Sequence, residues 1–310
     1  MRNKGIFTSL GVYLGGLLLA TAASVNAQSN AAGSSTTSFT VTAVGKKESA
    51  PSITKDDVQL FTGKERKQIG DWKKADQLAM AILIDDSIDS GAGGQWDYLK
   101  EFIMAQPAST SIAVGYLQNN TTRVAQDFTP DHALAAKAIR LPMGLGAIGS
   151  SPYLATLDLL KRWPNTGPRR SIVLITSGID YFRGSFFGAF YPDLDSVIQR
   201  AEKQNTNIWS IYYPSSGHRG HSFYQVNYAQ NNIDKMSEDT GAESYFLGSG
   251  NPVTIKPYLD EITTHLSNQY LLTFSGAGGS KGKFQSVKVK TELPDVEFFA
   301  PQSIFLPPGS

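Results

Sequence analysis

The chain has 310 residues, of which 41% are hydrophobic and 18% charged, a composition that excludes a fibrous or disordered protein and suits one large core. Its formal net charge of +1 gives no electrostatic reason to expect nucleic acid as a partner. Because it contains no cysteine, a disulfide framework, a thiol nucleophile and a thiolate metal site are excluded.

Residues 1–27 have the three parts of a secretory signal. Arg2 and Lys4 precede an apolar run near residues 10–23, and small residues lead to a cleavage site after Ala27. The apolar run is shorter than the ~20 residues that a spanning helix needs, which disfavours a membrane anchor. We therefore expect export to the periplasm, the cell surface or the medium, with no stable membrane span after cleavage.

After a flexible spacer at residues 28–37, short alternating stretches predict two or three strands within residues 38–75. These strands are too few to fold alone and need a partner sheet. Residues 270–306 also alternate with period two, and their glycine-rich turn predicts a hairpin. We expect the two segments to pair, forming a small β appendage from both ends of the chain.

Between these segments, residues 76–269 alternate apolar strand patterns with helical patterns. This alternation predicts a doubly wound, mostly parallel α/β sheet flanked by helices, whose ligands lie beyond the carboxyl ends of the strands. Residues 214–230, which include His218 and His221, are interpreted as a long solvated loop, with a histidine metal site as the less favoured alternative. The predicted strands cover residues 78–84, 111–117, 171–176 and 207–213, and the helical patterns start at Trp96, Asp131, Ser151, Asp193 and Ile255.

Acidic and hydroxyl side chains follow the first strand of this domain. Asp85, Ser87 and Asp89 alternate, so an extended strand end would place them on one side. Two carboxylates and a hydroxyl suit a hard divalent cation. The alternative is a helix N-cap with spare acids. Without a cation, Asp85 and Asp89 would repel each other and raise the pKa of one of them.

These residues carry a resemblance to a known family. A hydrophobic strand, Asp-x-Ser-x, glycines and a helix resemble the opening of a von Willebrand factor type A (VWFA) domain, whose metal-ion-dependent adhesion site begins Asp-x-Ser-x-Ser. The segments at residues 144–163 and 169–182 recur in the order that this family uses. Residues 41–69 and 298–301 resemble the exported VWFA-related group described from acidobacteria. The resemblance covers about residues 38–306.

The resemblance implies an altered metal site. Asp85 and Ser87 match the family pattern, while Asp89 stands where a serine is usual. Ser150 or Ser151 stands where a threonine is usual, and Ser177 replaces the aspartate of a Thr-Asp-Gly turn. The predicted ligands of one Mg²⁺ or Ca²⁺ ion are Asp85, Ser87, Asp89, Ser151, Ser177 and Asp180, and a site that binds no metal remains the alternative.

An aromatic segment at residues 181–191 follows the fourth strand, at the edge where ligands bind. It could form a partner surface, with Arg183, Phe186, Phe187 and Tyr191 as contacts, or pack as a lid over the core.

The resemblance implies a non-catalytic adhesion-type module that binds an unknown protein or glycan, with no catalytic residue. A structural subunit of an envelope or surface assembly is the alternative. A metal-dependent hydrolase is third, because no Gly-x-Ser-x-Gly stands at a predicted strand-to-helix turn and Ser87 stands where an aspartyl phosphatase has a second aspartate.

Overall fold

The computed structural model describes residues 35–45, 52–89, 95–144, 150–163, 169–182, 192–214, 223–246 and 253–309. The predicted signal at residues 1–27 lies outside these ranges. So do the predicted partner contacts Arg183, Phe186, Phe187 and Tyr191.

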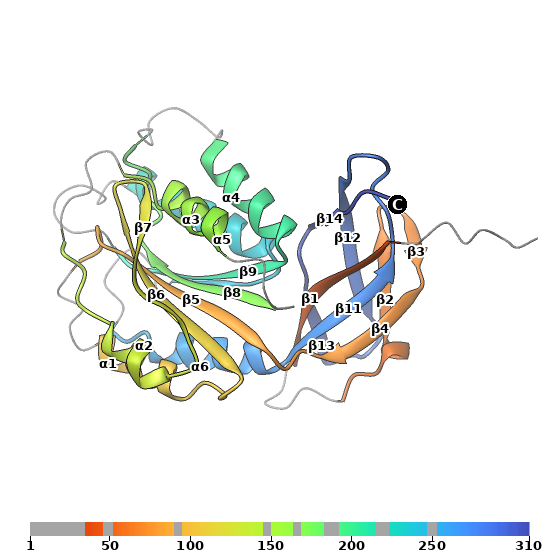
Figure 1. The fold of residues 1–310 in the computed structure, drawn as a ribbon, viewed down its shortest axis with the longest axis horizontal. Helices are drawn as coiled ribbons and strands as arrows, with labels where there is room; N and C mark the ends of the chain where they lie inside the picture. The colour runs from red at the N-terminus through yellow and green to blue at the C-terminus, as the bar shows by residue number, and fades with distance from the viewer. Residues whose placement is uncertain are drawn as a thin grey trace, which may run out of the picture. The chain divides into compact units, whose positions relative to one another are not determined.

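A six-stranded sheet forms the centre of the α/β domain, with the order β10-β9-β8-β5-β6-β7 (Figure 1). The strands from β10 to β6 are parallel, and β7 pairs with β6 antiparallel. The predicted, mostly parallel sheet is confirmed. The strands are β5 (Leu78–Asp85), β6 (Thr110–Gln118), β7 (Thr121–Thr129), β8 (Arg170–Thr176), β9 (Thr206–Tyr212) and β10 (Ser244–Tyr245).

Helices cover both faces of this sheet because its strands are apolar on both sides. In β5, Met80, Ile82 and Ile84 join one buried cluster, while Ala81 and Leu83 join the other. The first cluster lies under α1 (Gln95–Met104), α2 (His132–Lys137) and α6 (Lys256–Ser267), and the second under α3 (Pro152–Arg162), α4 (Pro192–Lys203) and α5 (Phe223–Asp239) (Figure 1). No helix in the described ranges is both long and apolar enough to cross a membrane.

Two of these elements differ from the sequence prediction. Residues 223–230, interpreted as loop, begin α5, whose buried side chains include Val226, Ile233 and Met236. The antiparallel strand β7 was not predicted, and most of its side chains are exposed or half-buried. His218 and His221 lie outside the described residues.

The two ends of the chain together form a pair of four-stranded sheets, ordered β13-β1-β11-β4 and β14-β12-β2-β3. β1 pairs antiparallel with both β11 and β13, and β12 pairs with β2 and β14. These strands are β1 (Thr36–Gly45), β2 (Val58–Thr62), β3 (Glu65–Lys67), β4 (Ile69–Lys74), β11 (Gln269–Ser275), β12 (Lys283–Thr291), β13 (Val296–Phe299) and β14 (Ser303–Leu306), and a short 3-10 turn (Lys55–Asp57) precedes β2.

The predicted C-terminal hairpin is wrong, because β11 and β12 belong to different sheets. The glycine-rich turn instead carries the chain from one sheet to the other. Gly282 has a φ of +73°, and a Cβ atom on Gly278 would lie 2.4 Å from the Lys283 nitrogen. The chain therefore approaches itself too closely at this crossing for larger residues. Side chains from both sheets, Phe39 and Leu60 among them, share one buried cluster.

Candidate binding site at the carboxyl edge of the sheet

Asp85 is the last residue of β5 and is only 3% exposed. One of its carboxylate oxygens accepts from the Ser87 main-chain nitrogen at 2.9 Å, and the other accepts from the Thr176 hydroxyl at 2.7 Å. Burial raises the pKa of the Asp85 carboxyl, and the hydrogen bonds from Thr176 and Ser87 offset part of that effect. The ends of two neighbouring parallel strands thus meet at this carboxylate.

The expected alternation of Asp85, Ser87 and Asp89 along a strand is not observed. β5 ends at Asp85, and the chain turns so that the Ser87 nitrogen faces back toward it. The Asp89 nitrogen donates to the Pro214 carbonyl at 3.0 Å, which places Asp89 beside the end of β9. The pKa of Asp85 is raised as expected, but the cause is burial, and the neighbouring charge that adds to it is Asp86.

Asp86, which the sequence analysis did not single out, forms a bidentate ion pair at this edge. Its carboxylate, 5% exposed, accepts from both terminal nitrogens of Arg140 at 2.7 Å. Gln118 also donates to it, and Arg140 stacks over the Tyr116 ring at 3.6 Å. No sequence signal links two residues 54 positions apart.

A second buried pair joins two of the predicted residues. Ser151 is the N-cap of α3, and its hydroxyl accepts from the Leu154 nitrogen at 3.3 Å. The same hydroxyl donates to Asp180 at 2.9 Å, and the two residues are 1% and 3% exposed. Asp180 also accepts from the Phe182 nitrogen at 3.0 Å. The loop before α3 and the segment after β8 therefore meet at this pair.

The turn after β8 is Thr176-Ser177-Gly178. Gly178 has a φ of +66°, and a Cβ atom there would lie 2.5 Å from Ile233 of α5, so glycine is required. The Thr176 hydroxyl accepts from the Gly178 nitrogen and reaches Asp85. Ser177, the predicted ligand, is fully buried and accepts from the Ile179 nitrogen at 3.4 Å. Thr176 is the residue of this turn that reaches the Asp85 carboxylate.

The donor types at this edge fit a hard divalent cation. Asp85 and Asp180 offer carboxylate oxygens, and Ser87 and Ser151 offer hydroxyls, which are the ligands that Mg²⁺ and Ca²⁺ prefer. Within the described ranges, no cationic side chain pairs with Asp85, whereas Asp86 has Arg140. A carboxylate has about four acceptor positions, so the hydrogen bonds from Thr176 and Ser87 leave Asp85 capacity for an ion.

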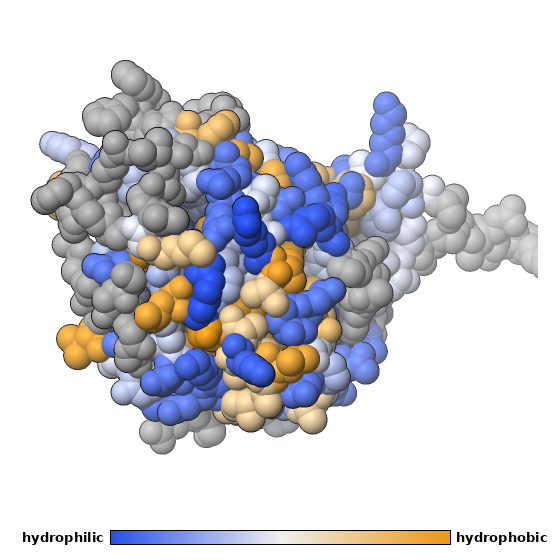
Figure 2. Space-filling model, turned by 60° about the vertical axis from the view of Figure 1, so that its left-hand side comes forward, coloured by the Kyte–Doolittle hydropathy of each residue, from blue (hydrophilic) through white to orange (hydrophobic). Residues whose placement is uncertain are grey.

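Apolar side chains adjoin these buried acids. Leu141, Met143 and Phe182 are 48%, 54% and 51% exposed. The Met143 nitrogen donates to Asp86 and the Phe182 nitrogen to Asp180, so the same segments carry both features. Figure 2 shows one face of the molecule, on which hydrophobic and hydrophilic residues are interspersed.

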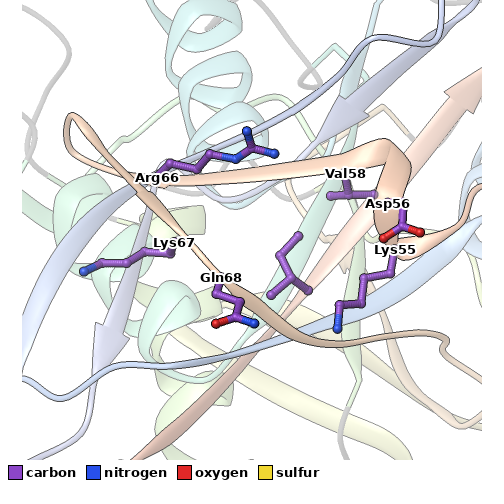
Figure 3. A pocket seen from close by; sticks show the side chains of 7 residues that line it. Lys55, Asp56, Val58, Arg66, Lys67 and Gln68 are labelled. Atoms are coloured by element: carbon purple, nitrogen blue, oxygen red, sulfur yellow. The ribbon is translucent and has the colours of Figure 1, made fainter.

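A cavity of about 580 Å³ is lined by residues between Lys55 and Ile69, in the segment that contains β2 and β3. Its lining includes Lys55, Arg66 and Lys67, a set that could attract an anion. Figure 3 shows that these side chains extend in different directions rather than toward one point. Lys67 also pairs with Glu65 at 2.7 Å. We assign no function to this cavity.

No family model and no curated protein matches the sequence. Solved structures similar to the chain include an aerotolerance-related membrane protein from Bacteroides fragilis, with 11% identity and a TM-score of 0.44, covering 61% of this chain and 98% of that one. A von Willebrand factor type A protein from Catenulispora acidiphila has 11% identity and a TM-score of 0.43, with coverage of 81% and 76%. The PilB minor pilin from Streptococcus sanguinis has 12% identity and a TM-score of 0.39, with coverage of 63% and 62%. VWFA domains are thus among the folds to which this chain is similar.

Proposed function

We propose that this protein is a non-catalytic, exported binding module that engages a protein or glycan at the carboxyl edge of its six-stranded sheet. One divalent cation, Mg²⁺ or Ca²⁺, completes the site. Asp85, Ser87, Ser151 and Asp180 supply its protein ligands, with Asp89 and Ser177 as further candidates. The cation supplies a positive charge to which an acidic or hydroxyl group of the partner binds.

The observation that carries this proposal is the buried Asp85 carboxylate. It is 3% exposed and has no cationic partner in the described part of the chain. A buried carboxylate without a counter-charge is costly, and a bound cation removes that cost. Asp86, the adjacent residue, already has Arg140 as its counter-ion, so Asp85 is the acid left for an ion.

The apolar rim supports a role in binding. Leu141, Met143 and Phe182 are each about half exposed and adjoin the acidic residues. Apolar side chains around a polar centre are typical of a surface that a partner covers. The proposed partner contacts Arg183, Phe186, Phe187 and Tyr191, which lie outside the described residues, follow Phe182 in sequence.

The chemistry at this edge supports a non-catalytic role. The described residues there provide acids, hydroxyls and an arginine that is paired with Asp86. The two described histidines lie elsewhere: His132 contacts the Thr110 carbonyl, and His265 is buried against Trp209. The site as described therefore has no histidine for general acid or base work.

A structural subunit that binds no metal is the second candidate, and one observation favours it. Asp85 accepts two hydrogen bonds, and Asp180 accepts from Ser151 and the Phe182 nitrogen. Such bonds stabilise carboxylates without an ion. Cation binding separates the two candidates.

The test is the melting temperature of the chelated protein, titrated with Mg²⁺, Mn²⁺ and Ca²⁺. An ion that binds only the native state raises apparent stability by about 2.7 kcal/mol at a hundredfold excess over its dissociation constant. We expect a saturable rise with one of these ions and none in Asp85→Ala. In chelator, we also expect Asp85→Ala to be at least as stable as the parent, because the variant lacks the buried Asp85 carboxylate.

Asp97→Ala is the control, since it removes an exposed acid from α1. It should keep the full ion-dependent rise. An equal rise in Asp85→Ala and the parent would exclude Asp85 as a ligand, and no rise with any ion would favour the structural subunit.

A further inference from the structure

Three potential metal ligands meet far from the carboxyl edge in sequence. Glu243 lies between α5 and β10, and Glu261 and His265 lie four residues apart on α6. Positions i and i+4 of a helix share one face. One ligand atom from each of the three residues lies within 4.8 Å of the other two. In the described part of the chain, this is the one group of at least three acidic or histidine residues with such spacing.

The His265 imidazole is held in place and is electrically neutral. The residue is 4% exposed, and its ring lies 5.3 Å from that of Trp209 and 5.6 Å from that of Phe299. Burial lowers the pKa of His265 to about 4, so the ring carries no charge near neutral pH. A neutral imidazole is the form that binds metals.

The contact between His265 and Glu243 has the spacing of two ligands rather than of a hydrogen bond. Nδ1 of His265 lies 3.9 Å from a carboxylate oxygen of Glu243, which is too long for a direct hydrogen bond. Zn²⁺ binds nitrogen and oxygen at about 2.0–2.2 Å, so two ligands of one ion lie on the order of 3–4 Å apart. The Tyr245 hydroxyl lies 3.3 Å from the same Glu243 oxygen and 3.2 Å from Nδ1.

Negatively charged side chains surround this group. Burial raises the pKa of the Glu243 carboxyl, and the charges of Glu261, Asp234 and Glu297 raise it further. A cavity of about 360 Å³ reaches Glu243, and its lining residues include Asp234, Glu238 and Glu297 but no lysine or arginine. Such a cavity attracts cations and gives them a path to Glu243.

We propose that Glu243, Glu261 and His265 bind one divalent transition-metal ion, with Zn²⁺ as the preferred ion. One imidazole nitrogen and two carboxylates form a donor set that suits Zn²⁺, with water completing the coordination. The Tyr245 hydroxyl lies within hydrogen-bond distance of both Glu243 and Nδ1 of His265, so once Nδ1 binds the ion the hydroxyl proton is left to donate to Glu243 and orient it. This site shares no residue with the proposed cation site at Asp85.

The test is calorimetric titration of untagged, chelated protein with Zn²⁺. We expect one site in the parent and at least tenfold weaker binding in Glu261→Gln. Glu261 is exposed, so glutamine there should leave the melting temperature in chelator unchanged. Asp260→Asn is the matched control, because it removes one exposed charge from the adjacent position of α6 and should bind Zn²⁺ like the parent.

Other outcomes overturn the proposal. Absence of binding by the parent, or equal affinity in Glu261→Gln and the parent, excludes this group as the site. Equal affinity would direct attention to His218 and His221. Loss of Zn²⁺ binding in Asp85→Ala would place the ion at the carboxyl edge. A Co²⁺ titration gives an independent readout, since visible absorption of protein-bound Co²⁺ should appear in the parent and Asp260→Asn but not in Glu261→Gln.

Discussion

Asp85 and Asp86 are adjacent buried acids whose charges are compensated in different ways. Asp86 receives two bonds from the Arg140 guanidinium, which itself stacks on Tyr116. Among the described residues, Asp85 receives neutral donors, which are the Thr176 hydroxyl and the main-chain nitrogen and side chain of Ser87. Asp86 thus holds the segment after α2 against the end of β5, and Asp85 is left as the acid that a ligand can use.

Arg140→Gln should destabilise the protein by about 2 kcal/mol. Removing one partner of a buried ion pair costs about 3–5 kcal/mol, and the cost is lower here because water reaches the Arg140 side chain, which is 37% exposed. Urea unfolding of the variant measures the change. In Asp86→Asn/Arg140→Gln neither charge of this pair remains, so at least half of the loss should be recovered. If the unfolding free energy of Arg140→Gln lay within about 0.5 kcal/mol of the parent's, the stabilising role of the Asp86–Arg140 pair would be contradicted.

The site residues that the sequence predicted stand next to element ends that the sequence also predicted. Asp85 ends the first strand, and Ser151 precedes the helix at Pro152. Parallel strands bring such ends to one edge, which is why Asp85 and Thr176 meet. Arg140 could not be predicted, because its contact with Asp86 depends on the path of a segment that has no periodic pattern.

At the scale of elements, burial on both faces made the strands of the central sheet easy to predict. Continuous apolar runs mark β5, β6, β8 and β9 within one or two residues of their bounds. α5 was missed because polar residues separate its widely spaced apolar positions, Val226, Ile233 and Met236. The C-terminal hairpin was predicted wrongly because period-two alternation identifies a strand but not its partner.

Ser151→Ala should cost about 2 kcal/mol, because the hydroxyl serves both α3 and Asp180. Loss of an N-cap costs about 1 kcal/mol, and loss of a hydrogen bond to a charged group costs about 1.5–3 kcal/mol, less here because Asp180 keeps the bond from the Phe182 nitrogen. Urea midpoints of the variant and the parent in chelator measure the effect without any metal contribution. Ser151→Thr keeps the hydroxyl and should lose less than half as much. Equal losses in the two variants would show that side-chain size, not hydrogen bonding, matters here.

At the scale of the whole molecule, hydrogen bonds connect the six-stranded sheet and its helices to the paired four-stranded sheets. The Ser303 nitrogen at the start of β14 donates to Glu202 of α4 at 3.0 Å. The Thr40 nitrogen of β1 donates to Asn205 at 2.8 Å. Burial raises the pKa of Glu202 to about 7, so the carboxyl that accepts from Ser303 changes its protonation state near physiological pH.

Glu202 and His265 should affect stability with opposite signs on acidification. A glutamate whose pKa rises from 4.5 to about 7 on folding adds stability as the pH falls from 7 to 4.5. A histidine whose pKa falls from 6.5 to about 4 on folding makes the folded protein less stable as the pH falls from 6.5 to 4. The two contributions therefore partly cancel in the parent.

Glu202→Gln removes only the first contribution and keeps an acceptor for Ser303. We expect the variant to be more stable than the parent at pH 8, where Glu202 is charged, and to lose stability more steeply between pH 7 and pH 5. Urea midpoints at unit pH intervals provide the measurement. Parallel curves for the two proteins would exclude a titrating Glu202.

The position of β1 between β11 and β13 has a consequence for the order in which the chain can assemble. Synthesis delivers a protein from its first residue onward, so β1 and β2 are made long before β11 and β12, with which they pair. The six strands of the central sheet are all complete by Tyr245. A nascent chain therefore holds β1 without either of its partners, and β2 paired only with β3, while the central sheet folds behind them. Chains that terminate before Gln269 lack both partners of β1 and the β12 partner of β2, and these open strand edges make such products prone to aggregation and degradation.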